Sequence, residues 1–379
     1  MDDELLNQPG SGSIMIQGMG KSGILKAGKA FMEHSKKLGI DQLIEASEEV
    51  NGHKVRFRLR KEIRDRYLQE YDTLHLCETF HLHSQTNEAD LESEILLSML
   101  SGPLTFEYPS YAELAASVHI RMNIVKAACR TALAFHTSKI ERPADYWTYS
   151  EARGFTIVPG KSLIEALRKA TQPDVSGERY AFSCYRASEY VNLLAIAQVA
   201  ATCNRALLQQ LQEQWEDRAI MSRQFHDVFL REYGSMSNPL PCKYYIPGDR
   251  LWFRNPDERS ADITGYEGSW IFYLGNGLFS NFWERDKPFT LSSKCIEIFH
   301  WRHGVYEDAS GKLQMNEGIV EERVRASMSD PEESKRILEL MMRLRDPRGV
   351  YAAGGCIDAT RECPRFVCPA SSDIFLPEE

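Results

Sequence analysis

The residue in this chain best placed for covalent chemistry is Cys184. It follows Ser183, a residue type that often caps helix N-termini, and precedes a nearly uncharged run, Tyr190 to Ala201, with the composition of a buried helix. A thiol at a helix start lies at the positive end of the backbone dipole, which favours the thiolate. We therefore predict a nucleophilic cysteine here; the alternative is a small apolar residue packed at a helix start.

A thiolate in this position suits acyl transfer. It attacks a carboxamide or peptide carbonyl, the amine leaves, and a second nucleophile resolves the thioester. Backbone N–H groups at the helix start are placed to stabilise the oxyanion. Water as the acceptor gives hydrolysis or deamidation, whereas a lysine amine gives an isopeptide crosslink.

The elements that must position this cysteine are a run of predicted helices followed by a run of predicted strands, which predicts an α+β fold. The hairpin signal Asn276-Gly277 joins the last two predicted strands. We predict helices over 109–138, 161–171, 184–216, 218–234 and 331–345, and strands over 244–247, 250–254, 270–274 and 278–283.

We expect the first hundred residues to form an N-terminal extension. Glycine and serine dominate residues 1–23, which we expect to be a mobile arm. Residues 25–50 and 85–100 have helical patterns, and Gly102-Pro103 breaks the second helix. We therefore divide the chain into an extension (1–101), a core (102–304), and a C-terminal helical segment with an irregular tail from 346 (305–379). Two alternating segments, 54–60 and 74–83, are predicted to be strands.

The cysteines and histidines do not predict a metal site. His75, His81 and His83 share a predicted strand face with Cys77, but ligands from one strand rarely close a tetrahedron. The chain has nine cysteines, and an odd number without a leader favours free thiols. The last three, Cys356, Cys363 and Cys368, lack zinc-ribbon spacing. We predict no metal and no cofactor.

Charge and hydropathy exclude other classes. The formal net charge of −9 argues against a nucleic-acid binder. No apolar run reaches the roughly 18 residues of a membrane span. The acidic start Met1-Asp2-Asp3-Glu4 has no signal-peptide pattern, so we expect synthesis in the cytoplasm, with leaderless export still open.

Three blocks in register resemble the bacterial, spore-associated protein-glutamine gamma-glutamyltransferase family. Together they indicate a resemblance over about half of the chain. The blocks are Phe106–Leu114 with Ile120–Val125 and Tyr146-Trp147, then Tyr180–Ala187, then Gly248–Asp257 leading to Leu274-Gly275.

The resemblance implies a papain-like cysteine transglutaminase core that joins glutamine and lysine side chains of protein substrates without a metal. Cys184 matches the family nucleophile. The glutamate that precedes it in the family is Ser183 here, and the position of a partner glutamate is Ser269. Glu267 lies two residues away, about 6–7 Å along an extended strand and on the same face. A nearby family histidine aligns with Asn281.

These departures leave three explanations open for the base. Glu267 has taken the carboxylate role, or a histidine has replaced it, or the domain binds without catalysing. The candidate histidines are His226, His300 and His303. A papain-like amidase or peptidase is a further alternative, and it would need such a histidine beside the thiol. The predicted walls of a substrate tunnel are Trp147, Tyr185, Trp252 and Trp270.

Overall fold

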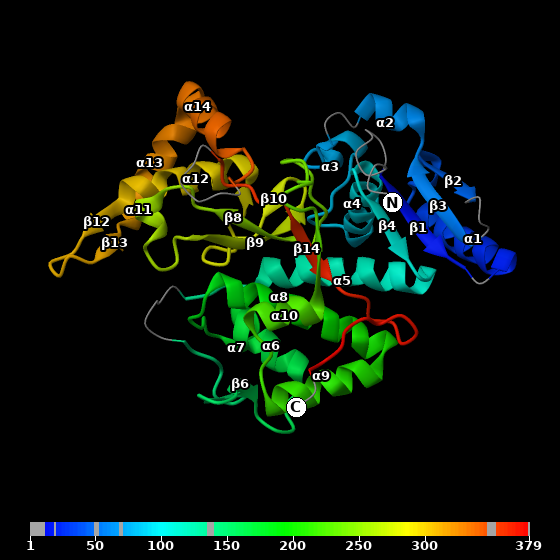
Figure 1. Cartoon of the computed structure of the whole chain (residues 1–379), viewed down its shortest axis with the longest axis horizontal. Helices are drawn as coiled ribbons and strands as arrows, with labels where there is room; N and C mark the ends of the chain where they lie inside the picture. Colours follow the sequence, from blue (N-terminus) through cyan, green and yellow to red (C-terminus); the bar gives the residue numbers. More distant parts are fainter. Residues whose placement is uncertain are drawn as a thin grey trace.

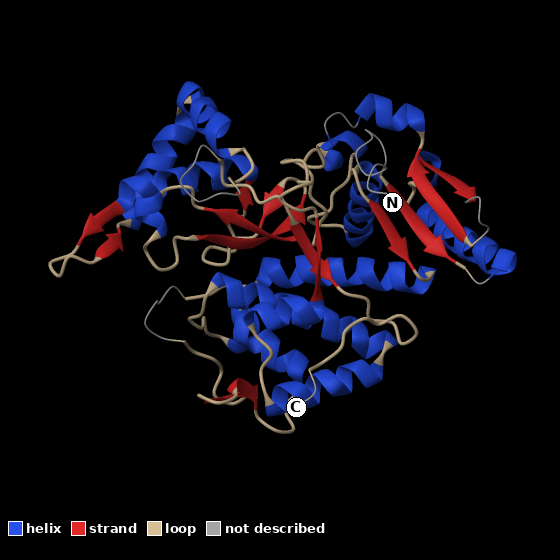
Figure 2. Ribbon diagram, viewed as in Figure 1, coloured by secondary structure: helices blue, strands red, loops and turns tan. Residues whose placement is uncertain are grey.

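A computed structural model describes residues 12–18, 20–48, 53–67, 71–134, 140–346 and 354–377. Two upper lobes and a lower layer of helices surround a central sheet (Figures 1 and 2). The described residues therefore have a mixed helix and sheet architecture, as the sequence predicts. None of the helices among them has the length and apolar composition that a bilayer crossing requires.

The N-terminal lobe is built on a four-stranded sheet of order β2-β3-β1-β4, in which β1 pairs antiparallel with β3 and parallel with β4. Its strands are β1 (Ser13–Gln17), β2 (Ile44–Glu48), β3 (Lys54–Leu59) and β4 (Thr105–Tyr108). Its helices are α1 (Gly20–Lys37), the 3-10 helix η2 (Asp41–Leu43), α2 (Lys61–Tyr67), α3 (Leu76–Phe80) and α4 (Glu88–Ser101).

The expectation of a mobile arm over residues 1–23 is wrong for its described part. Ile14 and Ile16 are fully buried in a central strand, and α1 begins at Gly20. Gly12 lies so close to the carbonyls of Leu100 and Gly102 that a Cβ would overlap them. The glycine therefore serves close backbone packing here. Residues 1–11 and Met19 lie outside the described residues.

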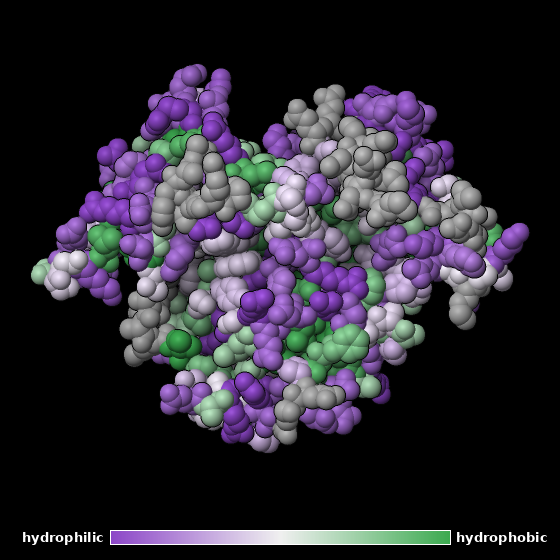
Figure 3. Space-filling view, viewed as in Figure 1, coloured by the Kyte–Doolittle hydropathy of each residue, from purple (hydrophilic) through white to green (hydrophobic). Residues whose placement is uncertain are grey.

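The lower layer is helical, and its centre is the packing of α8 against α5. Hydrophobic side chains gather over the middle of this lower part in Figure 3, whereas the tops of both upper lobes are mostly hydrophilic. The helices are α5 (Tyr111–Arg130), α6 (Leu163–Thr171), α7 (Pro173–Ser176), α8 (Cys184–Cys203), α9 (Arg205–Asp217) and α10 (Ser222–Phe229). A small hairpin, β5 (Trp147–Ser150) with β6 (Gly154–Ile157), lies beside them.

The central sheet has six strands in the order β11-β10-β9-β8-β14-β7. Its C-terminal strand β14 pairs antiparallel with β7 and with β8, so Glu362 lies opposite both Glu232 and Arg250. The irregular tail expected from residue 346 is therefore wrong at this strand. The strands are β7 (Leu230–Tyr233), β8 (Arg250–Arg254), β9 (Gly268–Gly275), β10 (Leu278–Phe279), β11 (Phe289–Thr290) and β14 (Arg361–Pro364).

The second upper lobe packs on the other face of this sheet around a separate core that includes Phe253, Ile296 and Met341. Its elements are α11 (Glu258–Ala261), α12 (Leu291–Gly304), β12 (Val305–Glu307), β13 (Leu313–Met315), α13 (Glu317–Ser329) and α14 (Pro331–Met341).

Several local predictions are confirmed. Strands occupy 54–59 and 250–254, β9 contains 270–274, and a helix occupies 88–101. The hairpin forms with positive φ at Asn276 (52°) and Gly277 (71°), the conformation that Asn-Gly favours in a two-residue turn.

Other local predictions are wrong for identifiable reasons. Residues 74–83 contain the helix α3, ended by His81 in the left-handed conformation, so the three histidines and Cys77 do not share a strand face. The helix predicted over 184–216 breaks at Asn204, whose side chain caps α9 by accepting the Leu207 N–H at 3.2 Å. The segment 244–247 forms no strand, and 230–233 is a strand rather than the end of a helix.

Candidate active site

Cys184 is the first residue of α8, as predicted, and Ser183 is its N-cap. The Ser183 Oγ accepts the Arg186 N–H at 3.2 Å. Both residues line a cavity of about 610 Å³, enclosed by the start of α8, β8, β9, the β5–β6 hairpin and the segment 264–268. The sequence thus places the thiol at the wall of a pocket large enough for a side chain and part of its backbone.

The electrostatics of this thiol differ from the sequence expectation. Burial raises the pKa of Cys184, because it penalises the charged thiolate. Backbone N–H groups of Trp270 and Tyr185 and the charges of Lys294 and Arg250 act in the opposite direction but do not reverse the shift. The resting side chain is therefore a neutral thiol, and the helix dipole alone does not ionise it.

Three of the four predicted aromatic walls lie at this cavity. Trp252 and Trp270 are direct cross-strand partners, and their rings stack at 5.9 Å and 13°. The Tyr185 ring meets the edge of Trp270 at 5.3 Å. Gly268, at the start of β9, permits this arrangement, because a Cβ there would overlap the Trp252 indole nitrogen.

Trp147 lies elsewhere. It is buried in the helical layer, where its ring stacks on Tyr190 at 5.3 Å and 11°. Its indole N–H donates to the Ala166 carbonyl at 2.9 Å. This side chain is therefore part of the core behind the cavity and not of its lining.

The two candidate residues on the β9 segment differ in position. Glu267 lines the cavity, and its Oε2 accepts the Gly265 N–H at 2.9 Å. Ser269 is buried and pairs with Phe253, which belongs to the second core. Since side chains alternate along a strand and Trp270 faces the cavity, Ser269 faces away from Cys184.

Asn281 organises a turn beside the cavity without lining it. Its Oδ1 accepts the N–H groups of Trp283 at 3.2 Å and Glu284 at 3.1 Å, and its Nδ2 donates to the Lys287 carbonyl at 3.0 Å. Trp283 does line the cavity. The amide thus holds a wall residue that the sequence pattern did not single out.

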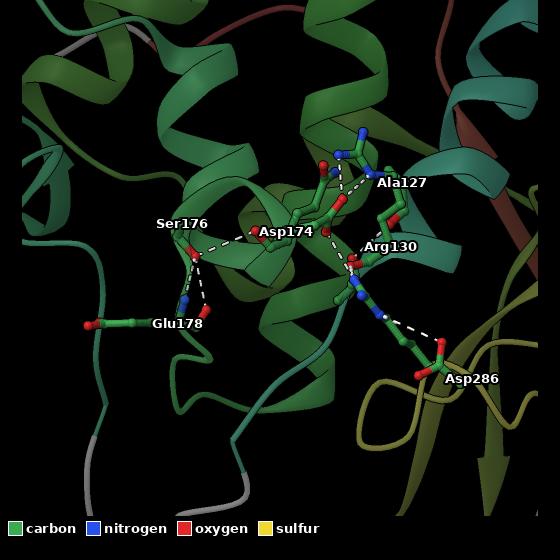
Figure 4. Close-up of polar contacts among 9 residues, drawn as sticks. Ala127, Arg130, Asp174, Ser176, Glu178 and Asp286 are labelled. Carbon is green, nitrogen blue, oxygen red and sulfur yellow. Dashed lines mark hydrogen bonds and ion pairs between the residues drawn. The ribbon is translucent and has the colours of Figure 1, made fainter.

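A surface ion-pair network fixes the same turn from outside (Figure 4). Asp174 on α7 forms ion pairs with Arg130, at the end of α5, at 2.6 Å and with Arg285 at 2.9 Å. Arg285 also donates to the Arg130 carbonyl at 3.2 Å. Since Arg285 is two residues from Trp283, the network connects the helical layer to this wall.

None of the three candidate histidines lines the cavity. His300 and His303 are 2.9 Å apart through their Nδ1 atoms on α12, and His300 Nε2 lies 2.8 Å from Ser327 Oγ on α13. Burial lowers the pKa of His300 to about 4 and also lowers that of His303. His226 lies 3.3 Å from Glu362 on β14.

A buried polar network lies beneath the first turns of α8, and the sequence did not predict it. Arg250 pairs with Glu362 and donates from Nε to the Ser188 Oγ at 2.7 Å. Its guanidinium carbon lies 3.8 Å from the Trp270 ring centroid. Glu362 falls in a tail with no strand pattern, so no sequence signal placed it beside Arg250.

The first turns of α8 also hold an acidic group. Glu189 pairs with Arg186 and accepts the Ser222 N–H at 2.8 Å. Burial raises the pKa of Glu189 to about 7, against the opposing charges of Arg186 and Arg250. This carboxyl group does not line the cavity.

The described residues contain no cluster of histidine, cysteine and acidic side chains that fits a metal ion. All nine cysteines are free. The three C-terminal cysteines do not cluster, because each has a different neighbour. Cys356 Sγ lies 3.5 Å from Cys295 Sγ, Cys368 hydrogen-bonds Cys203, and Cys363 lies beside Tyr233.

The sequence profile of the family described as "Protein-glutamine gamma-glutamyltransferase" matches residues 72–367. The match covers most of the chain and contains the cavity, Cys184 and β14. The chain belongs to this family, which confirms the resemblance found in the three sequence blocks.

Two bacterial relatives have the same description. The protein from Halalkalibacterium halodurans is 24% identical over 216 residues, which cover 53% of this chain and 66% of that protein. The protein from Bacillus pumilus is 27% identical over 187 residues, which cover 48% of this chain and 68% of that protein. The chain thus spans about two thirds of the length of each relative. A solved transglutaminase from Geobacillus stearothermophilus, without its C-terminal extension, matches 56% of this chain and 98% of its own at 19% identity, with a TM-score of 0.38.

Proposed function

We propose that this protein transfers the acyl group of a protein glutamine through a thioester on Cys184, to a lysine amine or to water. The observation that carries the proposal is the position of Cys184. It is the first residue of a buried helix and lines a deep aromatic cavity, in a chain of the protein-glutamine gamma-glutamyltransferase family. Its protein substrates bear glutamine and lysine, and the reaction needs no metal.

The chemistry has two steps. Cys184 Sγ attacks the carboxamide carbon, the C–N bond breaks, and the thiol proton leaves with the amide nitrogen as ammonia. The lysine amine then attacks the thioester, the C–S bond breaks, and the displaced sulfur takes back a proton. The backbone N–H groups of Tyr185 and Trp270 lie at the sulfur and are suited to stabilising negative charge there.

We assign the proton relay to Glu267. Support comes from its place on the cavity wall, where it is the one carboxylate among the described lining residues. Its Oε2 accepts the Gly265 N–H at 2.9 Å, and the relay requires the carboxylate to come within hydrogen-bond reach of the thiol proton. A neutral resting thiol makes such a base necessary.

We further propose that a papain-like arrangement underlies this site, with residues 102–304 as the core and 1–101 and 305–379 as flanking parts. The support is a cysteine at a helix N-terminus with the antiparallel pair β8 and β9 across the cavity. In one sheet, β4 of the core pairs with β1 of the N-terminal flank. In the other, β14 of the C-terminal flank lies between β7 and β8 of the core, so both flanks pack onto this core.

The test is incorporation of a labelled primary amine into a glutamine-rich protein, read by mass spectrometry. We expect adducts with the wild type, with and without a chelator. Cys184→Ala should abolish them, whereas Cys129→Ala, an exposed cysteine on α5, should not change them. Glu267→Gln should lower the rate by about a hundredfold or more, the range of general acid–base contributions. A conversion of glutamine to glutamate without adducts would mean that water is the acceptor.

The second candidate is a binding protein on the same fold. It is favoured by the neutral thiol, whose pKa is influenced mainly by burial, by the backbone of Trp270 and Tyr185 and by the charges of Lys294 and Arg250, rather than by a carboxylate or an imidazole. A folded wild type that yields neither adduct nor glutamate would establish this candidate. The positions of His226, His300 and His303 give no support to a histidine-dependent peptidase.

A further inference from the structure

Arg142 is a charged side chain of the cavity that the proposed reaction does not use. It lies before β5, is 8% exposed, and lines the same cavity as Cys184. The other lining arginine, Arg186, pairs with Glu189. Arg142 has no carboxylate partner among the described residues.

The hydrogen bonds of Arg142 leave most of its donors unused. A guanidinium has five N–H donors. Nε donates to the Tyr190 hydroxyl at 3.2 Å, and one Nη1 hydrogen goes to the Glu141 carbonyl at 2.6 Å. The second Nη1 hydrogen and both Nη2 hydrogens have no acceptor in the described structure, and Nη2 keeps some exposure to solvent. The free edge of the fork is therefore accessible.

Aromatic rings hold the guanidinium in place. Its central carbon lies 3.8 Å from the ring centroid of Phe182, 4.8 Å from Phe155 and 4.9 Å from Tyr190. Phe182 is two residues before Cys184, so the cation packs against the segment that leads into the nucleophile. Such rings offset part of the cost of burying a cation, but they supply no anion and no acceptor for the free N–H groups.

The cavity lining also leaves the charge of Arg142 without an ion-pair partner. Arg186 is paired with Glu189, and Glu267, the one carboxylate of the described lining, accepts the Gly265 N–H and forms no ion pair with Arg142. The N-terminus of α8 adds positive potential at the same wall. Arginine binds carboxylates in a bidentate fork, and that geometry matches the free edge of Arg142.

We infer that Arg142 forms a carboxylate-binding subsite in the cavity, so that the preferred donor is a glutamine with a carboxylate close to it. This inference rests on the function proposed above, since it names a substrate class for the Cys184 site. Two sources share the chemistry: the free C-terminal carboxylate of a donor peptide, or the side chain of a neighbouring aspartate.

The test measures binding rather than turnover, on the full chain with Cys184→Ala. Four probes are titrated and followed by tryptophan fluorescence: acetyl-Gln-Gly with a free C-terminus, its C-terminal amide, acetyl-Gln-Asp-amide and acetyl-Gln-Asn-amide. We expect at least one carboxylate probe to bind about tenfold or more tightly than its neutral counterpart, as charge-assisted hydrogen bonds imply. The first pair reports the C-terminal source, and the second pair reports the side-chain source.

Variants of the arginine separate an anion site from a packing role. In the Cys184→Ala protein, the further change Arg142→Met should reduce the affinity ratio between carboxylate and neutral probes to about twofold or less. The neutral probes should bind as before. Arg142→Lys keeps the charge but loses the fork, so it should retain part of the preference. Arg254→Met removes an arginine 5.3 Å from the Trp252 ring that does not line the cavity, and should leave the preference intact.

Equal binding of both members of both pairs would overturn the inference, as would a preference that survives Arg142→Met in a folded protein. Binding to the Cys184→Ala protein does not depend on catalysis. A selective but inactive protein would therefore refute the proposed function alone, and an active protein without selectivity would refute the carboxylate subsite alone.

Discussion

Replacing Glu362 by glutamine should destabilise the protein through the buried network under α8. The Arg250 side chain is 2% exposed and that of Glu362 is 10% exposed. Nη2 of Arg250 already lacks a partner, and Nε is taken by Ser188. Removing one member of a buried ion pair costs about 3–5 kcal/mol. Glutamine keeps one acceptor, so we expect a loss of about 3 kcal/mol in the free energy of unfolding.

The chain provides a matched control for this change. Glu232 lies directly opposite Glu362 on β7, but it is exposed to solvent. Glu232→Gln should therefore alter the free energy of unfolding by less than about 0.5 kcal/mol. Urea unfolding followed by tryptophan fluorescence gives both values.

The difference in unfolding free energy between the wild type and Glu362→Gln should depend on pH, which gives a second readout. Burial opposes ionisation of Glu362, but the Arg250 charge and the hydrogen bonds from His226 and Arg250 outweigh it and lower its pKa. This stabilisation is present above the unfolded pKa near 4.5 and is lost as the pH falls through the folded value. The hydrogen bond to Glu362 raises the pKa of His226. The charged His226 therefore adds stability that is fully present below about pH 6.5 and is lost as the pH rises through the pKa of His226 in the folded protein.

The gap between the wild type and Glu362→Gln should therefore be largest between about pH 4.5 and 6.5, where both groups are charged. Above that window it should shrink in part, because Glu362 and Arg250 remain paired. Equal stability of the two variants, or a gap that does not vary with pH, would refute the reasoning.

Three further predictions concern the cavity and the second core. Gly268→Ala should displace Trp252 and reduce amine incorporation, with a changed near-UV circular dichroism spectrum; an unchanged spectrum and rate would contradict the packing argument. Alkylation of Cys184 by iodoacetamide should have its pH midpoint above that of a free cysteine, and a midpoint below it would contradict the burial effect. The neutral folded His300, with a pKa of about 4, adds stability that is full above pH 6.5 and is lost as the pH falls towards 4. Its replacement by glutamine should flatten the pH dependence of unfolding in that range, and an unchanged slope would show that it titrates freely.

Local patterns predicted much of the site because they depend on neighbours in sequence. The N-cap Ser183 and the apolar run after Cys184 require only a helix start and a helix composition. The pairing of Trp252 with Trp270 was not predicted, although both strands were, because register depends on contacts between strands. The strand predicted over 74–83 is wrong because alternation over ten residues does not distinguish a strand from a turn and a short helix.

By itself, the sequence determined the family, the mixed fold class, the cysteine at a helix start and the central β9–β10 hairpin. Only the tertiary structure decided that β14 joins the central sheet, that Glu362 lies beside Arg250 and that Ser269 faces away from the thiol. It also decided that the thiol is neutral at rest, because desolvation depends on every segment that covers the sulfur. Helix caps and turns are local interactions, whereas strand order, burial and charge pairing arise from residues that the chain brings together only when it folds.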